Sequence, residues 1–361
     1  MQARIALATA LFVLSAAGCP REQDTAEVSP RFQTEHDAIL DHLVADFWSE
    51  DGDWEGDMQG DATAFAPRVL YAAGEERGEG RYAEMAGTTV EHEVALLQAY
   101  LLTHVLTMDA VIGAPGLADG YEVTHNETWR ALFLGGAAMG YDMMVTDPDQ
   151  FLPYVFDLAT VYGSGATMCF RAWELSELEA HRTNGLDLVA RADAEAWDEA
   201  EGRYDWTLVM DWPQATMIMA LVGAYRATGD EAYLERAQRV HQTMEEQCWD
   251  DERGGWLAAS GAHGKGLSGN NNMAWALLDL YEVTGDRTVL ARAGDTLAYT
   301  LTEDLYSAEE AMAYHHWYDD TVSEPGRADY YCTGCNFQLL ANVQRYHRNT
   351  GFERAAGLAS E

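Results

Sequence analysis

Hydrophobic residues recur with the period of an α-helix along most of the chain. In the stretch ATMIMALVGAYRA, residues 215–227, apolar side chains fall at positions i, i+3, i+4 and i+7, the spacing of a helix with a packed face. The sequence TGD follows, and then a second amphipathic stretch, EAYLERAQRVHQTM. Gly229 suits the left-handed residue that ends the first helix, and Asp230 can cap the second. This pattern predicts a helical hairpin.

The hairpin pattern repeats along the chain. The segment AWALLDLYEVTGDRTVLARAGDTLAYTL is a second copy, in which Gly285 and Asp286 occupy the turn. Weaker copies cover 66–97 and 337–359, and another helix–turn–helix pattern covers 129–163. Paired helices that recur about every 50 to 60 residues predict a helical array, which can be an open solenoid or a closed ring.

The N-terminus departs from this pattern. MQARIALATALFVLSAAGC has a basic residue at Arg4, an apolar run and small residues before Cys19, as secretory signals do. Its end, LSAAGC, resembles a bacterial lipobox, although Ala16 stands where leucine is usual. The resemblance implies cleavage before Cys19 and a lipid on its sulfur, which would anchor the protein to a membrane of the bacterial cell envelope, in the periplasm or at the cell surface. The alternative is an ordinary cleaved signal with a stray cysteine.

These features predict three parts of the chain. We expect a signal peptide over residues 1–18, a polar tether over 19–30 and a single folded domain over 31–361. Beyond the signal, no segment of about 18 uncharged apolar residues is present to form a membrane-spanning helix.

The excess of acidic residues limits the classes of molecule that the protein can bind. Of the 361 residues, 60 are acidic and 22 basic, which gives a formal net charge of −38. This charge repels phosphate backbones, so we expect no nucleic acid partner. Acidic polysaccharides are disfavoured too, unless arginines line the binding cleft. We expect a monomer with no metal and no cofactor.

Four cysteines remain besides Cys19, and an oxidising compartment permits two disulfides among them in three connectivities. They are Cys169, Cys248, Cys332 and Cys335. For the CTGC segment at 332–335, a structural disulfide is favoured over a redox pair or half of a metal site, because no βαβ pattern surrounds it.

Several ordered motifs resemble the six-hairpin toroid glycosidases. The motifs are the run AY-x2-TGD-x2-YL-x2-A, the aspartate-containing corner before it, the segment CWDDERGGW and the corner SGNNNMAW. The similarity is closest to the endo-α-mannanase-like glycoside hydrolase family 76, within a superfamily that includes the acylglucosamine 2-epimerases. It is clearest over residues 205–352. The resemblance implies an all-α domain, an (α/α)6 toroid, with a carbohydrate substrate bound where loops enter the inner helices.

Asp211, in the corner DWPQ, is the first catalytic candidate. The family carries two adjacent aspartates at this corner, whereas here Trp212 takes the second place. Glycoside hydrolysis uses two carboxyl groups, so the partner would come from another corner, with Asp320 and Asp61 as candidates. Alternatively, Asp211 is the first member of a capping box with Gln214.

Aromatic and amide side chains at the same corners are candidate sugar ligands, because rings stack on sugars and amides bind hydroxyl groups. These candidates are Trp206, Trp212, Asn270, Asn271, Asn272, His315, His316, Tyr330 and Tyr331. We expect an exported glycoside hydrolase that cleaves a polysaccharide or oligosaccharide with paired carboxyl groups, and two other functions stay open. The chain could be a glycan-binding toroid that lacks catalysis, or a sugar epimerase in which His315 or His316 moves a proton next to a carbonyl.

Overall fold

A computed structural model describes most of the chain, in the ranges 32–56, 61–103, 115–151, 157–207, 209–302, 304–318, 326–327 and 330–351. Contacts divide the chain into two units, Met1–Arg31 and Phe32–Glu361, and all the described residues lie in the second. The expected signal peptide, the tether and Cys19 therefore lie outside the described residues, as does Asp320.

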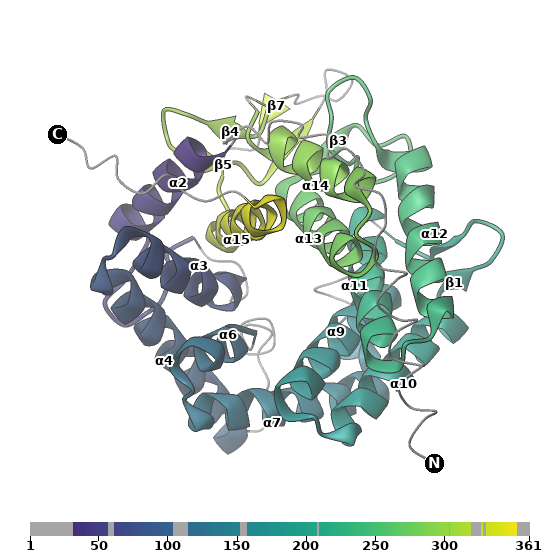
Figure 1. Ribbon diagram of the computed structural model, residues 1–361, viewed down its shortest axis with the longest axis horizontal. Coiled ribbons are helices and arrows are strands. Elements are labelled where there is room, and N and C mark those ends of the chain that lie inside the picture. Colours follow the sequence, from purple (N-terminus) through teal and green to yellow (C-terminus); the bar gives the residue numbers. More distant parts are fainter. Residues whose placement is uncertain are drawn as a thin grey trace, which may run out of the picture. The chain divides into compact units, whose positions relative to one another are not determined.

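The described helices form two concentric sets within the unit Phe32–Glu361 (Figure 1). The inner set is α3 (Asp61–Arg77), α6 (Pro115–Thr124), α9 (Leu158–Ser176), α11 (Asp211–Thr228), α13 (Leu267–Thr284) and α15 (Thr333–Thr350). The outer set is α2 (Gln33–Asp46), α4 (Gly80–Thr103), α7 (Glu127–Thr146), α10 (Glu179–Glu195), α12 (Glu231–Cys248) and α14 (Arg287–Thr300). The last inner helix, α15, packs against α3, so the ring closes. The closed ring, rather than the open solenoid, is the correct alternative.

Short strands and a 3-10 turn, η1 (Pro148–Gln150), connect the helices. The strands are β1 (Trp197–Asp198), β2 (Arg203–Tyr204), β3 (Gly264–Gly266), β4 (Tyr306–Ser307), β5 (Met312–Ala313), β6 (His316–Tyr318) and β7 (Gly326–Arg327). They form the antiparallel pairs β1–β2 and β4–β5 and the three-stranded sheet β3–β6–β7. In that sheet Lys265 pairs with Trp317, which holds the loop before α15 beside the start of α13.

The two TGD turns have the predicted geometry. Gly229 and Gly285 end α11 and α13 with φ values of 70° and 66°, a conformation that residues with a side chain rarely adopt. Asp230 then accepts a hydrogen bond from the amide of Ala232 at 3.0 Å. Asp286 accepts one from Thr288 at 2.8 Å. Each turn therefore ends one helix and caps the next.

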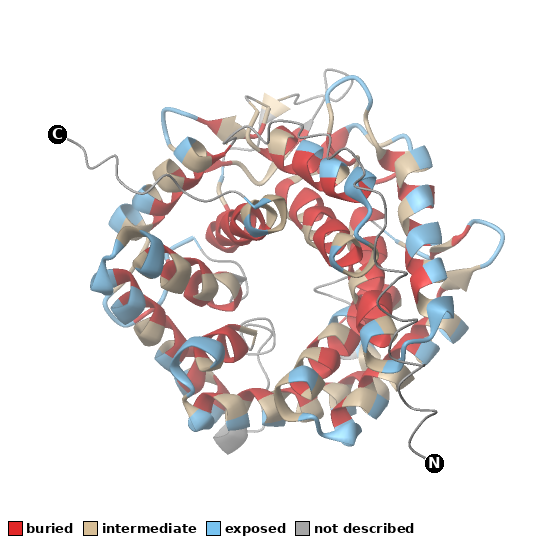
Figure 2. Ribbon diagram, in the orientation of Figure 1, coloured by how far each residue is buried: buried red, intermediate tan, exposed pale blue. Residues whose placement is uncertain are grey.

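The core lies between the two rings, and the inner helices are buried on most sides (Figure 2). Fully buried side chains include Trp54, Tyr82, Trp256 and Phe337. Among the described helices, none is both long enough and apolar enough to cross a membrane.

Of the four cysteines, Cys332 and Cys335 form a disulfide at the start of α15. Cys169 and Cys248 are separate buried thiols, so the second disulfide that the count permitted does not form. Burial raises the pKa of each of these two thiols to about 12.

Candidate active site

A central cavity of about 520 Å³ lies inside the inner ring. The helices line it with residues spaced three or four positions apart, as one face of a helix requires. On α11 these residues are Trp212, Thr216, Met219, Gly223 and Arg226. The helix thus presents an aromatic ring near its amino-terminal end and a charge near its carboxy-terminal end.

The carboxy-terminal part of the cavity wall is a network of ion pairs. Arg345 donates to Asp279 at 2.6 Å and lies 2.7 Å from Glu282. Arg226 contacts both of these carboxylates, at 3.5 and 3.0 Å.

A second group of ion pairs lines the cavity from α3, α6 and α9. Arg68 holds Asp119 through two hydrogen bonds, at 3.1 and 2.6 Å. Arg171 lies 3.3 Å from Glu174. Arginines therefore do line the cavity, and each of them contacts a carboxylate.

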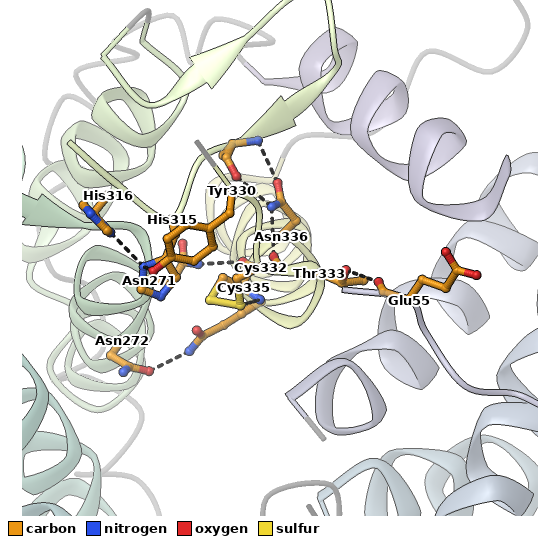
Figure 3. The surroundings of a disulfide bond; sticks show 12 residues. Glu55, Asn271, Asn272, His315, His316, Tyr330, Cys332, Thr333, Cys335 and Asn336 are labelled. Atoms are coloured by element: carbon orange, nitrogen blue, oxygen red, sulfur yellow. Dashed lines mark hydrogen bonds between the residues drawn. A yellow bond between two sulfur atoms is a disulfide. The ribbon is translucent and has the colours of Figure 1, made fainter. Parts of the chain in front are cut away.

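The amino-terminal part of the cavity is aromatic and polar without charge. Trp212, Ser268 and Asn272 line it from α11 and α13. Gln338 of α15 donates to Asn272 Oδ1 at 2.7 Å (Figure 3). Rings for stacking and amides for hydroxyl groups are the lining that binds a sugar. Two predicted residues, Trp212 and Asn272, belong to this lining.

Asp211 lies behind the cavity wall. It is 2% exposed, and its carboxylate lies against Gly269, where a β-carbon would come within 1.7 Å of Oδ2. Burial raises the pKa of Asp211 to about 7, although the amide of Trp212 donates to its carboxylate at 2.9 Å. Asp211 is therefore a protonatable group next to two cavity-lining residues, Trp212 and Ser268.

The capping-box interpretation of this corner is wrong. Met210 is the N-cap residue and makes no side-chain cap. Gln214 bonds instead to both backbone groups of Tyr204, accepting from N at 2.9 Å and donating to O at 2.7 Å.

Asn270 and Asn271 are fully buried, and their side chains form hydrogen bonds with backbone groups. Asn270 accepts from the amide of Trp256 at 2.8 Å and donates to the carbonyls of Trp256 and Gly266. Asn271 donates to the carbonyl of Cys335 at 2.7 Å, which joins α13 to α15. Of the three consecutive asparagines, only Asn272 reaches the cavity lining.

His315, His316 and Tyr330 form a hydrogen-bonded group, here called the histidine cluster (Figure 3). The Nδ1 atoms of the two histidines are 3.0 Å apart, and the Tyr330 hydroxyl lies 2.8 Å from His315 Nδ1. The carbonyl of His315 accepts from Leu267 N at 2.8 Å, which places the cluster over the first turn of α13. None of its three residues belongs to the lining of the central cavity. Burial, with a smaller effect of His316, lowers the pKa of His315 to about 4, and burial also lowers that of His316. Both rings are therefore neutral at pH 7.

The other predicted residues lie elsewhere. Tyr331 donates to Glu310 and packs against Tyr314, at 4.6 Å between ring centres. Trp206 lines a separate pocket of about 240 Å³. Asp61 is the first residue of α3, and its side chain lies outside the described part.

Several residues of the cavity were not predicted, among them Trp275, Gln338 and the arginines. Trp275 lies three residues after Asn272, so a search for cavity-facing positions along each inner helix would have found it. The pairing of Arg345 with Asp279 joins two helices and leaves no local signal in the sequence.

Part of the chain, residues 183–273, matches the N-acylglucosamine 2-epimerase (GlcNAc 2-epimerase) family. No curated protein is significantly similar in sequence. Among solved structures, the chain is similar to an unsaturated glucuronyl hydrolase specific for heparin, at 13% identity and a TM-score of 0.64, over 87% of this chain and 95% of the other.

Two further structures are comparably similar. One is the cellobiose 2-epimerase of Bacillus thermoamylovorans, at 13% identity and a TM-score of 0.60, over 87% of this chain and 98% of the other. The other is a family 76 α-mannanase of Bacteroides thetaiotaomicron, at 12% identity and a TM-score of 0.62, over 88% and 96%. At these identities the likeness concerns the fold, and at that level it confirms the resemblance found in the sequence. The chain has the (α/α)6 toroid fold that the resemblance to six-hairpin glycosidases implied.

Proposed function

We propose that the protein is an enzyme that converts a saccharide bound at the amino-terminal end of the central cavity, where Ser268 of the first turn of α13 lines the cavity and the histidine cluster lies over the same turn. We further propose that its reaction is a proton transfer next to a sugar carbonyl, as in an aldose–ketose isomerase or a 2-epimerase. The observation that carries this proposal is the histidine cluster, a pair of neutral imidazoles over the first turn of α13. The partial match to the GlcNAc 2-epimerase family supports the same class.

The lining of the cavity supports a saccharide. Trp212 offers a ring for stacking, and Asn272 and Gln338 offer amide groups. The ring of Trp275 instead lies against Arg68 and Arg345, whose guanidinium carbons are 4.9 and 5.4 Å from its centre. The described carboxylates of the cavity are Asp119, Glu174, Asp279 and Glu282, and all of them contact arginines. These carboxylates are therefore already engaged in ion pairs.

His315 is a neutral imidazole and can therefore accept a proton, as a weaker base than a histidine of ordinary pKa. Its lowered pKa keeps it neutral above about pH 4. Both of its side-chain hydrogen bonds use Nδ1. When Nδ1 donates to either neighbour, Nε2 carries the lone pair that can accept a proton. The Tyr330 hydroxyl lies on the Nδ1 side, so its oxygen can accept from Nδ1–H and stabilise the imidazolium that forms when Nε2 takes a proton.

Asp211 favours a second candidate, a glycoside hydrolase. A buried carboxyl group whose pKa is about 7 is half protonated at neutral pH, as a general acid for glycosidic cleavage requires. The family 76 resemblance of this corner supports the same activity. This candidate needs a second carboxylate, for which Asp61 and Asp320 stay the proposals.

One experiment separates the two candidates. The protein is incubated in D₂O with a panel of reducing monosaccharides and disaccharides, and with α-mannan and other polysaccharides. An isomerase or epimerase gives a product of unchanged chain length with deuterium at C2, whereas a hydrolase releases new reducing ends without C2 exchange. Neither product from any saccharide, with binding still measurable, would reject both enzymes and leave the glycan-binding alternative.

A further inference from the structure

The wall of the central cavity changes in character along its axis, and contacts between the inner helices show where. Gln338 donates to Asn272 at 2.7 Å, and Arg345 donates to Asp279 at 2.6 Å. Both bonds join α15 to α13 with the same separation in sequence, so the two helices run parallel and in register. About two helical turns, or about 10 Å, therefore separate this amide pair from this ion pair along the axis.

The helices α9 and α11 are also parallel and in register. A β-carbon on Gly163 would come within 3.0 Å of the Thr216 backbone, and one on Gly223 within 2.5 Å of the Phe170 ring. These two contacts also have the same separation in sequence. The second lies beside the ion pairs, because Arg226 in the next turn of α11 belongs to them. Residues between the two contacts therefore lie between the amide pair and the ion pairs.

Apolar side chains line this interval of the cavity. Met219 of α11 and Met168 of α9 lie between the two contacts and belong to the lining. On α13 the interval contains Trp275, whose ring centre is 5.8 Å from that of Phe65 of α3, another lining residue. We call Phe65, Met168 and Met219 the apolar belt. Phe65 and Met219 are partly exposed, so a molecule in the cavity can contact them.

The hydroxyl groups near the belt are used within their own helices. Thr167 donates to the carbonyl of Gly163 at 2.9 Å, and Thr216 donates to that of Trp212 at 3.1 Å. The exposed Ser164 lies at the amino-terminal end of the interval, nearer the amide pair. A saccharide hydroxyl at the height of the belt would exchange water for apolar neighbours, which costs free energy, whereas an aliphatic group would gain it.

The amide pair at the amino-terminal side of the belt suits the sugar ring itself. The bond between Gln338 and Asn272 uses Nε2 of the first and Oδ1 of the second. Oε1 of Gln338 and Nδ2 of Asn272 can therefore bind the hydroxyl groups of a ligand. When C1 and C2 of the sugar point toward Ser268, one turn earlier on α13, the opposite side of the ring faces the belt.

We propose that the substrate is a reducing sugar that carries a short aliphatic chain, such as an acyl ester on O6, and that this chain lies in the apolar belt. The proposal rests on the proposed function, because the position of the histidine cluster sets the orientation of the sugar. The ion pairs at the carboxy-terminal end of the belt limit the chain to a few carbon atoms.

The test is calorimetric titration of the full protein with D-glucose, D-mannose and D-galactose and with their 6-O-acetyl, 6-O-butanoyl and 6-O-decanoyl esters. We expect the butanoyl ester of at least one sugar to bind about tenfold more tightly than its acetyl ester, because the additional methylene groups enter the belt. The decanoyl ester should bind more weakly than the butanoyl ester, since the ion pairs block a long chain. A terminal hydroxyl on the butanoyl chain should abolish the gain.

Variants locate the chain. Met219→Gln keeps the length of the side chain but makes it polar, and it should remove most of the gain of the butanoyl over the acetyl ester. Met219→Leu should keep most of that gain. The control is Met143→Gln, which changes a partly buried methionine of the outer helix α7 that does not line the cavity and should retain the whole gain. Circular dichroism shows whether each variant is folded.

Equal affinities for the acetyl and butanoyl esters in the wild type, or a gain that folded Met219→Gln retains in full, would overturn the proposal. So would the absence of binding of every ester. C2 exchange of the same sugars in D₂O is measured in parallel. Exchange without a gain from the butanoyl chain would refute the belt proposal alone, whereas a gain without exchange would support the belt and refute the proposed reaction.

Discussion

Replacing Asp211 with asparagine should stabilise the protein at neutral and alkaline pH. The carboxyl group is buried, and burial raises its pKa from the model-compound value of 3.8 to about 7. The folded state therefore holds the proton more tightly than the unfolded chain does. As pH rises from about 4 to about 7, the unfolded chain loses the proton first, which lowers its free energy, so the folded state becomes progressively less stable relative to it.

The magnitude follows from the size of the pKa shift. At about 1.4 kcal/mol per unit, the rise from 3.8 to about 7 costs about 4 kcal/mol once the pH exceeds 7. Water entry beside the ionised group would reduce this cost, so about 4 kcal/mol is an upper bound. Asparagine has the same shape, keeps an acceptor for the amide of Trp212 and has no charge to bury. The two proteins should be equally stable near pH 4, and the variant should be more stable by up to about 4 kcal/mol above pH 7.

The assay is urea unfolding of both proteins at pH 4 to 9, followed by circular dichroism. Asp230→Asn is the matched control, because Asp230 is an exposed N-cap residue and asparagine caps as well as aspartate does. That variant should stay within about 0.5 kcal/mol of the wild type at every pH. A constant difference between Asp211→Asn and the wild type across this range would refute the reasoning, because only a titrating group gives a pH-dependent one.

Three further predictions follow from other parts of the chain. Lys265→Met should lower the free energy of unfolding by about 3 kcal/mol in urea, because it leaves Asp250 without the ammonium that lies 2.6 Å away. Asn270→Ala should cost about 2 kcal/mol in the same assay, since it removes the acceptor of the buried Trp256 amide at 2.8 Å. Cys19→Ser should move the protein from the membrane fraction to the soluble fraction of the bacterial envelope, as detected by fractionation and immunoblot, and an unchanged distribution would contradict lipidation at Cys19.

The sequence could predict the fold because the hairpin signals are local. Gly229 and Asp230 are adjacent residues, and the conformation of each depends on the helix that it ends or begins. Repetition of this signal at Gly285 and Asp286 indicates stacked hairpins. Closure of the ring depends on contacts between α15 and α3, which are far apart in the chain. The resemblance to a known superfamily predicted that closure, and periodicity alone did not.

The candidate site was predicted less completely, because its properties arise between helices. Asp211 looks like an accessible corner residue in the sequence, and it is buried because Gly269 of the next inner helix leaves room for its carboxylate. Asn270 and Asn272 are nearly adjacent, yet the helical rotation directs one to the backbone around Trp256 and the other to the cavity. Which asparagine faces the cavity depends on the position of the axis of α13 in the ring.

The measurement that tests the central claim most directly is exchange of the C2 proton of a reducing sugar with D₂O, followed by NMR in the wild type and in His315→Gln. The control variant is His241→Gln, which changes a histidine of the outer helix α12 whose Nε2 lies 3.1 Å from Glu245. The account predicts C2 exchange in the wild type and the control, with a loss of about 100-fold or more in folded His315→Gln, as expected when a general base is removed. Exchange that survives in His315→Gln, or sugar turnover by the wild type without any C2 exchange, would contradict the account.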